Sequence, residues 1–345
     1  MGLPATQPAR STAGPTDHCP HRRRAVGKAA VPFYEHAMIL VITQSHYCNA
    51  GVLLRHWRAM GHDAFIFNID RFDAYRFEWR GDRFNIIDPL DREIDSAQVE
   101  AAAIYKGLLQ IDQECPWQHE YEGAKMLRSM MNAVSHTFAN WAIERKLLRL
   151  WTPYEMLYPK FKQMAAAQKY FAVPKAALSW NIPLPDREII VKPLVGRPPS
   201  EDSSFYAKKI SGEKLAPEYP WFTQEIAPGD RDATVLCING HIHSYQFATV
   251  RGELTDWRVT QGTDRNRWAP WKPGEEFERK VAAYMKEMNL KFGRLDFIIG
   301  GEEPQFLEVN PCGQFGFLDD LEGESFPLHR EAAEAILDPS STVTC

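Results

Sequence analysis

The sequence has few cysteines, no long apolar run and little net charge. Its 345 residues include six cysteines, without a C-x-x-C pair or regular spacing, which argues against a disulfide framework or a structural zinc site. No stretch approaches the roughly 18 consecutive apolar residues of a membrane span. The 40 Lys and Arg residues against 45 Asp and Glu residues give a net charge of -5, which does not point to a nucleic-acid partner. We therefore expect a cytoplasmic protein with no membrane segment and no nucleic acid, whose ligands are small molecules or peptides.

What is present is ordinary globular composition, with 44% hydrophobic and 25% charged residues. At roughly 150 residues per domain, the length suggests about two domains. Residues 1–37 differ from the rest, because they combine several prolines and small polar residues with no apolar periodicity and no signal-peptide core. We expect this segment to be a disordered tail.

The folded part opens with a strand, a helix and a strand. Residues 38–43 form a continuous apolar run typical of a strand buried on both faces, residues 50–60 have helical spacing, and residues 64–67 are strand-like. This order predicts a parallel sheet. The first loop carries neither G-x-G-x-x-G nor G-x-x-x-x-G-K-[ST], so dinucleotide-fingerprint and P-loop hypotheses lose most of their support.

Residues 120–150 form a long helical region. Its apolar residues recur near 3.6-residue spacing and are expected in the core; they are Met126, Leu127, Met130, Val134, Phe138 and Trp141. From residue 160 onward short helices alternate with strands that favour a mostly antiparallel α+β layer. The predicted strands are residues 176–179, 188–193, 221–226, 233–239, 243–250, 294–299 and 305–310.

The last two predicted strands each carry a carboxylate. A loop at residues 300–304 would pair Ile299 with Gln305 and place Asp296 directly opposite Glu308, with their β-carbons about 4.5 to 5.5 Å apart. Facing like charges destabilise a sheet unless a cation lies between them, and a divalent ion with oxygen ligands supplies one.

Asn310 completes this candidate metal set. Because side chains alternate along a strand, Glu308 and Asn310 should share one face with Phe306. The alternative is a register shifted by one residue, which would separate Asp296 from Glu308 and leave two solvated strand acids.

Three cations stand where they could meet an anionic ligand. Lys192 ends a buried strand just before a proline and a glycine-bearing loop at residues 196–204, although a strand-end lysine extending into solvent is the alternative. Lys160 opens a helix, where the macrodipole disfavours a cation, so a ligand phosphate would explain it better. Arg258, in Asp256-Trp257-Arg258, suits phosphate or carboxylate.

His241 and His243 form an H-x-H pattern on one strand face. This is a metal half-site in principle, but no cysteine or carboxylate has suitable spacing nearby. We expect these histidines to be structural.

Taken together, these motifs resemble the ATP-grasp superfamily, and more narrowly the microviridin-type (graspetide) peptide maturases related to MvdD. The closing signature of that family, a strand Asp followed by Phe-Leu-Glu-x-Asn-Pro-x-Gly-Gln, stands at Asp296 and at residues 306–314. Its strand lysine before proline stands at Lys192, and its Gln-Glu adenine hinge at residues 224–226. The resemblance covers about residues 38–338.

The resemblance implies an α/β chain with an α+β C-terminal part, in which an ATP-grasp fold follows an N-terminal parallel-sheet pre-ATP-grasp domain. The implied divisions are a tail (1–37), the pre-ATP-grasp domain (38–150), a central subdomain (151–222), a C-terminal nucleotide- and metal-binding subdomain (223–338) and a second tail (339–345).

It also implies an ATP-dependent carboxylate-amine or carboxylate-hydroxyl ligase that works through an acyl phosphate and forms ester or amide crosslinks in a ribosomally made precursor peptide. The implied Mg²⁺ ligands are Asp296, Glu308 and Asn310. The implied ATP-binding residues are Lys160, Lys192, Gln224, Glu225, Ile226 and Arg258, of which Lys192 and Arg258 are also the implied catalytic residues.

Two other functions stay open, an amino-acid ligase that extends a peptide or protein C-terminus and a non-catalytic nucleotide-binding protein, and so does a homodimer. The sequence also departs from the family. Thr234 stands where the family has a strand Arg, with Arg231 as a substitute nearby, and residues 104–107 replace the family's Trp-x-Arg-Arg-Pro.

Overall fold

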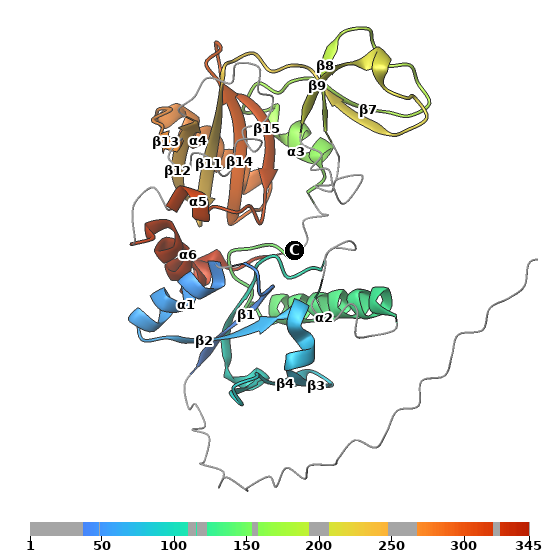
Figure 1. The fold of residues 1–345 in the computed structure, drawn as a ribbon. Helices are drawn as coiled ribbons and strands as arrows, with labels where there is room; N and C mark the ends of the chain where they lie inside the picture. The colour runs from blue at the N-terminus through green and yellow to red at the C-terminus, as the bar shows by residue number, and fades with distance from the viewer. Residues whose placement is uncertain are drawn as a thin grey trace, which may run out of the picture. The chain divides into compact units, whose positions relative to one another are not determined.

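The computed structural model describes residues 37–47, 49–109, 115, 123–153, 158–192, 207–247, 268–319 and 325–344. Figure 1 labels most of its helices and strands, which are numbered in chain order. The predicted loop at residues 196–204, Arg258 and all of the predicted N-terminal tail except residue 37 lie outside the described residues.

A parallel sheet forms near the start of the chain. Its strand order places β1 (Met38–Thr43) between β2 (Asp63–Asn68) and β6 (Val99–Ile104). Every residue of β1 is buried, as a continuous apolar run predicts for a strand covered on both faces. α1 (Asn49–Ala59) connects β1 to β2, and Gly61 follows it with a left-handed φ of 85°. The predicted β-α-β opening is confirmed.

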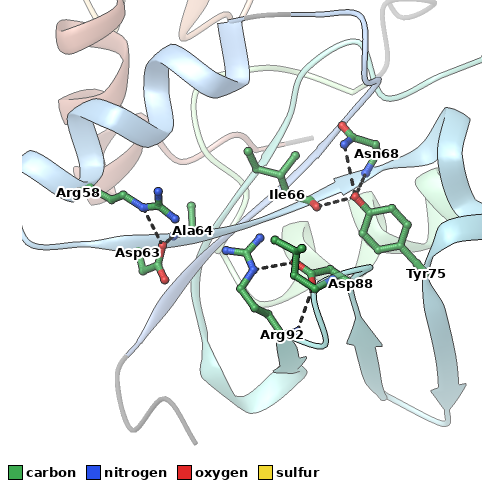
Figure 2. Close-up of polar contacts among 9 residues, drawn as sticks. Arg58, Asp63, Ala64, Ile66, Asn68, Tyr75, Asp88 and Arg92 are labelled. Carbon is green, nitrogen blue, oxygen red and sulfur yellow. Dashed lines mark hydrogen bonds and ion pairs between the residues drawn. The ribbon is translucent and has the colours of Figure 1, made fainter. Parts of the chain in front are cut away.

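A small antiparallel sheet with the order β3-β4-β5 follows. Its strands are β3 (Arg76–Arg80), β4 (Arg83–Ile87) and β5 (Glu93–Asp95). The Asp88 carboxylate holds the turn between β4 and β5, because it accepts hydrogen bonds from the Leu90 N–H at 2.8 Å, the Arg92 N–H at 2.9 Å and Arg92 Nε at 2.7 Å (Figure 2).

Short 3₁₀ helices are η1 (Ile69–Ala74), η2 (Ser96–Gln98), η4 (Gly212–Lys214) and η8 (Pro339–Ser341).

The long helix α2 (Ala124–Glu144) packs against the face of β1 that carries Leu40 and Ile42. Phe138 and Trp141 are buried there as predicted. The prediction is wrong for Met126 and Met130, which are 62% and 55% exposed. They stand four residues apart and therefore share the outer side of the helix.

Two antiparallel sheets with helices beside them occupy the described residues from 158 onward, confirming the predicted α+β part. The first has the order β7-β10-β8-β9, with β7 (Ala176–Ser179), β8 (Glu188–Lys192), β9 (Lys208–Ser211) and β10 (Trp221–Gln224). The second has the order β13-β12-β11-β14-β15, with β11 (Arg231–Ile238), β12 (His241–Phe247), β13 (Trp268–Pro270), β14 (Phe292–Ile299) and β15 (Gln305–Asn310). The helices of this part are α3 (Lys160–Ala167), α4 (Glu275–Glu287), α5 (Gly316–Asp319) and α6 (Pro327–Leu337).

One face of the five-stranded sheet packs against α4. Val235, Phe297 and Phe306 of the sheet share a fully buried cluster with Val281 and Tyr284 of the helix. Because side chains alternate along a strand, the residues between these apolar ones point to the opposite face. That opposite face carries the predicted metal residues.

α6 lies beside α1 (Figure 1), although the two helices are far apart in the sequence. Trp57 Nε1 on α1 donates a hydrogen bond of 3.0 Å to the carbonyl oxygen of Ala333 on α6. Ile336 of α6 belongs to the same buried cluster as Val41 of the parallel sheet and Phe292 of the five-stranded sheet. α6 therefore joins the cores of the two sheets. Over the described stretches of the chain, no helix has the length and apolarity needed to cross a membrane.

Candidate active site

The two predicted acids face each other across neighbouring strands. Asp296 on β14 lies directly opposite Glu308 on β15, as predicted. The predicted pairing of Ile299 with Gln305 is wrong, because Gln305 lies opposite Ile298. The register shifts by one residue immediately after Asp296, and this shift is what brings the two acids into line.

Leu307 is the extra residue of β15 at this shift. Phe306 pairs with Phe297 and Glu308 pairs with Asp296, so Leu307 has no partner of its own on β14. Such a bulge lets a strand change which residues share a face. Phe306 and Val309 both pack into the cluster with α4, so Phe306 lies on the opposite face from Glu308. The prediction that Phe306 shares a face with Glu308 is therefore wrong.

The predicted trio lies on the polar face of the hairpin formed by β14 and β15. Asp296 and Glu308 have side chains 20% and 19% exposed, respectively. Asn310 donates a hydrogen bond of 3.1 Å from Nδ2 to Asp296 Oδ2. Gly300 supports the turn of this hairpin, because it has a φ of 95° and a β-carbon there would lie 2.1 Å from Asp230 Oδ1.

Asp296 is the hydrogen-bonding centre of this face. In addition to Asn310, it accepts from Thr234 Oγ1 at 3.0 Å and from an Arg294 guanidinium nitrogen at 3.2 Å. Thr234 on β11 lies directly opposite Asp296 and is 1% exposed. Three donors fix the orientation of one carboxylate, and hydrogen bonds to a charged group are the stronger ones.

Lys160 contacts Glu308, the second acid of the pair. The Lys160 ammonium, at the first turn of α3, forms an ion pair and hydrogen bond with Glu308 Oε2. α3 is fastened to β15 by the buried Gln163, whose Oε1 accepts from the Val309 N–H at 2.9 Å and whose Nε2 donates to the Tyr158 carbonyl at 2.7 Å. Lys160 is thus held beside the acids by the packing of its own helix.

Lys192, Phe222 and Gln224 share one face of the four-stranded sheet. Lys192 lies directly opposite Phe222, and its Nζ is 5.6 Å from the centre of the Phe222 ring. Phe161, the neighbour of Lys160 on α3, lies 5.4 Å from the same ring. Gln224 is buried, and its Nε2 has no hydrogen-bond partner among the described residues. A buried donor of this kind suits a ligand acceptor.

The other two hinge residues follow Gln224 at the end of β10. The Glu225 N–H donates to the Lys175 carbonyl at 2.8 Å, and the Glu225 carboxylate accepts from Arg187 at 3.1 Å. Ile226 is 43% exposed. Ile226 therefore presents apolar surface at the position for which the resemblance implies adenine binding.

Arg231 is not placed to substitute for an arginine at position 234. The two positions lie on the same strand, β11, separated by an odd number of residues, so they face opposite sides of the sheet. Among the described residues, the arginine that contacts Asp296 on this face is instead Arg294, which the sequence prediction missed. Its position two residues before Asp296 on the same strand is the signal that could have identified it.

The acid face fits Mg²⁺ by its donor chemistry. Mg²⁺ prefers oxygen ligands, and in nucleotide sites it takes one or two carboxylates together with phosphate oxygens and water. Asp296 and Glu308 supply two carboxylates in direct opposition, and Asn310 supplies an amide oxygen on the same side. In this structure Arg294 and Lys160 neutralise the two carboxylates.

His241 and His243 both contact one carboxylate of α6. His243 Nε2 lies 2.8 Å from Glu331 Oε2, and His241 Nδ1 lies 3.4 Å from Glu331 Oε1. Glu331 is far away in the sequence, which is why the spacing did not reveal it. Within the described ranges, no group of three or more His, Cys, Asp or Glu side chains is arranged to hold a metal ion. The contacts fasten β12 to α6, in keeping with a structural role.

No family model matches the sequence, and no curated protein matches it. Solved structures do match. A RiPP-associated ATP-grasp ligase from Chryseobacterium gregarium, in complex with ADP and a leader and core peptide, aligns with a TM-score of 0.75 and 17% identity over 90% of this chain and 100% of its own. The macrocyclase MdnC from Microcystis aeruginosa, bound with precursor peptide MdnA, aligns with a TM-score of 0.67 and 20% identity over 87% of this chain and 99% of its own.

The ATP-grasp ligase PsnB, complexed with a precursor variant, Mg and ADP, aligns with a TM-score of 0.64 and 16% identity over 88% of this chain and 99% of its own. These matches extend over almost the whole length of each solved structure. The chain therefore has the fold of ATP-grasp ligases, and the predicted fold class is confirmed.

Proposed function

We propose that this protein is an ATP-dependent ligase that joins a side-chain carboxylate of a ribosomally made precursor peptide to a hydroxyl or amine of the same peptide. The observation that carries the proposal is the direct opposition of Asp296 and Glu308, with Asn310 and Lys160 in contact with them. This arrangement occurs in a fold whose solved examples include ligases complexed with ADP and precursor peptides.

The nucleotide is assigned to the side of the acid pair where α3 and the four-stranded sheet lie. Lys160 and Lys192 neutralise phosphate oxygens there, and Arg258 contributes a further cation from outside the described residues. Adenine lies against residues 224–226, where the buried Gln224 amide offers an unused donor. Mg²⁺, held by Asp296, Glu308 and Asn310, would supply charge neutralisation at the phosphates.

The chemistry has two balanced steps. A carboxylate oxygen of the peptide attacks the γ-phosphorus of ATP, and ADP leaves. A hydroxyl or amine of the peptide then attacks the carbonyl carbon of the acyl phosphate, loses its proton to solvent, and inorganic phosphate leaves. The peptide loses one water for each ester or amide formed, and the residues of the site act by positioning and charge neutralisation rather than by covalent catalysis.

The proposal includes the division of the folded chain into residues 38–150, 151–222 and 223–338. In that division β1 belongs to the first part, the four-stranded sheet lies mainly in the second, and β11 to β15 lie in the third. A homodimer and a cytoplasmic location stay predictions of the sequence.

Mass spectrometry of a precursor co-expressed with the protein tests the proposal. The candidate precursor is a short open reading frame beside the gene with a charged leader and a core rich in Asp or Glu with Thr, Ser or Lys. The expected result is a peptide lighter by one water per crosslink, with ADP and phosphate produced, and no mass loss with Glu308→Gln. A peptide heavier by one amino-acid residue would instead support the C-terminal amino-acid ligase. ATP binding without any change of peptide mass would support a non-catalytic protein.

A further inference from the structure

Arg294 has contacts that the proposed nucleotide site does not use. It lies directly opposite Asn310 on the polar face of β14, and its side chain is 12% exposed. One guanidinium nitrogen donates to Asp296 Oδ2 at 3.2 Å and another to the Gln314 carbonyl at 2.9 Å. The third, Nε, is buried and has no hydrogen-bond partner within the described part of the chain. A guanidinium with an unused donor is prepared for a further acceptor.

Arg294 and Lys160 contact different acids of the pair. Glu308 and Asp296 form one cross-strand pair, and Arg294 and Asn310 form the pair two residues earlier on β14. Positions two apart on a strand are separated by about 6.7 Å. Lys160 reaches Glu308 from α3, beside the outer strand β15, whereas Arg294 stands on β14 and contacts Asp296, so the two cations approach the pair at different acids.

The loop after β15 is shaped around Arg294. A β-carbon at Gly313 would lie 2.8 Å from the β-carbon of Arg294, so only glycine permits this approach. The approach brings the Gln314 carbonyl within hydrogen-bond distance of the guanidinium. Phe317, in the short helix α5 that follows the loop, places the centre of its ring 5.8 Å from the Arg294 guanidinium carbon. Ring and carbonyl together limit the directions that the guanidinium can take.

We propose that Arg294 binds the peptide carboxylate that is phosphorylated, and thereby sets the specificity of the site for Asp and Glu side chains. This inference rests on the proposed function. In-line phosphoryl transfer places the attacking oxygen across the γ-phosphate from the leaving ADP. If the nucleotide lies on the Lys160 side of the acids, the carboxylate lies on the Arg294 side. Arginine suits this role because its planar fork matches the two oxygens of a carboxylate.

The same placement makes Arg294 useful in the second step. Attack of the hydroxyl or amine on the acyl phosphate moves negative charge onto the former carboxylate oxygen, which lies within reach of the guanidinium. A donor fixed in advance at a developing oxyanion stabilises the transition state. Arg294 would thus touch the reacting group in both steps, which makes it a catalytic residue of the proposed reaction.

A double-mutant cycle between enzyme and peptide tests this inference. The probe is the labelled precursor that the wild-type protein dehydrates, together with a version in which its core Asp and Glu residues are Asn and Gln. Affinities are measured by fluorescence anisotropy with Mg²⁺ and ADP present. Arg294→Lys and Arg294→Gln should weaken binding of the acidic precursor by about tenfold or more, because a charge-assisted pair is lost. They should change binding of the neutral version and of ADP by less than about twofold.

Arg330→Lys is the matched control, because Arg330 is an exposed arginine of α6 paired with Glu334, and it should alter none of these affinities. Equal weakening of both peptides by the Arg294 variants would overturn the inference. So would a loss of ADP affinity at saturating Mg²⁺, since that would assign Arg294 to the phosphates. If the wild type dehydrates the precursor but the Arg294 variants give one of these contrary results, only the role of Arg294 is overturned and the proposed function still stands. A wild type that dehydrates no precursor removes the proposed function and this inference together.

Discussion

Thr234 Oγ1 lies 3.0 Å from Asp296 Oδ1, on the strand directly opposite. The hydroxyl is buried in the five-stranded sheet and donates to one of the two carboxylates of the candidate metal site. A small neutral donor therefore stands on β11 at this point, while Arg294 on β14 supplies the positive charge beside the same carboxylate.

Thr234→Val should alter metal dependence more than it alters folding. Valine keeps the shape of threonine but removes the donor to Asp296, so we expect a loss of about 1 kcal/mol in the free energy of unfolding. The less firmly oriented carboxylate should raise the Mg²⁺ concentration needed for half-maximal ATP turnover. Urea unfolding and a Mg²⁺ titration measure the two effects. Thr223→Val is the control, since that hydroxyl contacts the Ala177 carbonyl in the other sheet and should leave the Mg²⁺ titration unchanged.

Glu308→Gln should abolish most turnover while the protein stays folded. The substitution keeps the size of the side chain but removes a charge from the acid pair, and removing a preorganised electrostatic group typically costs about 10² to 10³ in rate. ATP consumption in the presence of the precursor measures it. Glu303→Gln, an exposed acid in the turn of the same hairpin, should behave like the wild type. Normal turnover by Glu308→Gln would remove the metal-ligand assignment.

Much of this architecture could be predicted from the sequence because local patterns determine it. The bounds of β1, β7 and β15 follow directly from short β-branched or alternating runs. The predicted elements do not include α6, although Leu328, Ala332 and Ile336 recur at helical spacing after a proline in the first turn.

The remaining differences come from tertiary contacts that spacing does not encode. Met126 and Met130 have helical spacing with the core residues, yet they lie on the outer side of α2. The bulge at Leu307 depends on how β15 packs against α4, so the predicted register was right for the acid pair and wrong for the residues beyond it. The contact of Lys160 with Glu308 joins residues that are 148 positions apart.

Lys192→Ala should reduce ATP turnover by about 10² to 10³, as expected when a positioned cation is removed from a developing phosphate charge. The lysine lies opposite Phe222 on a sheet face that also carries Gln224, so the fold should tolerate the change. Steady-state ATP hydrolysis and ADP affinity are the measurements. Lys209→Ala, on the exposed edge strand β9, is the matched control. Near-normal turnover by Lys192→Ala would leave this lysine as an ordinary strand-end residue.

Cys237 should react slowly with thiol reagents. Burial raises the pKa of the Cys237 thiol to about 11, so at pH 8 only about a thousandth of it is the reactive thiolate. Labelling with iodoacetamide at pH 8, followed by mass spectrometry of the peptide containing Cys237, should show little modification in native protein and rapid modification in urea. A labelling rate equal in the two conditions would mean that β11 opens readily, contrary to its central place in the five-stranded sheet.

Gln163→Met should weaken both folding and nucleotide use, because Gln163 is the connection that holds Lys160 beside the acids. Methionine has a similar length, but it leaves the Val309 N–H and the Tyr158 carbonyl without their partner, at a cost of about 1 to 3 kcal/mol. α3 should then dock less firmly on β15, so the KM for ATP should rise while the KM for the precursor stays nearly constant. Urea unfolding and steady-state kinetics separate the two effects, with Gln168→Met at the exposed end of the same helix as the control. Destabilisation without any change in the KM for ATP would show that α3 supports the fold but does not position Lys160 for the nucleotide.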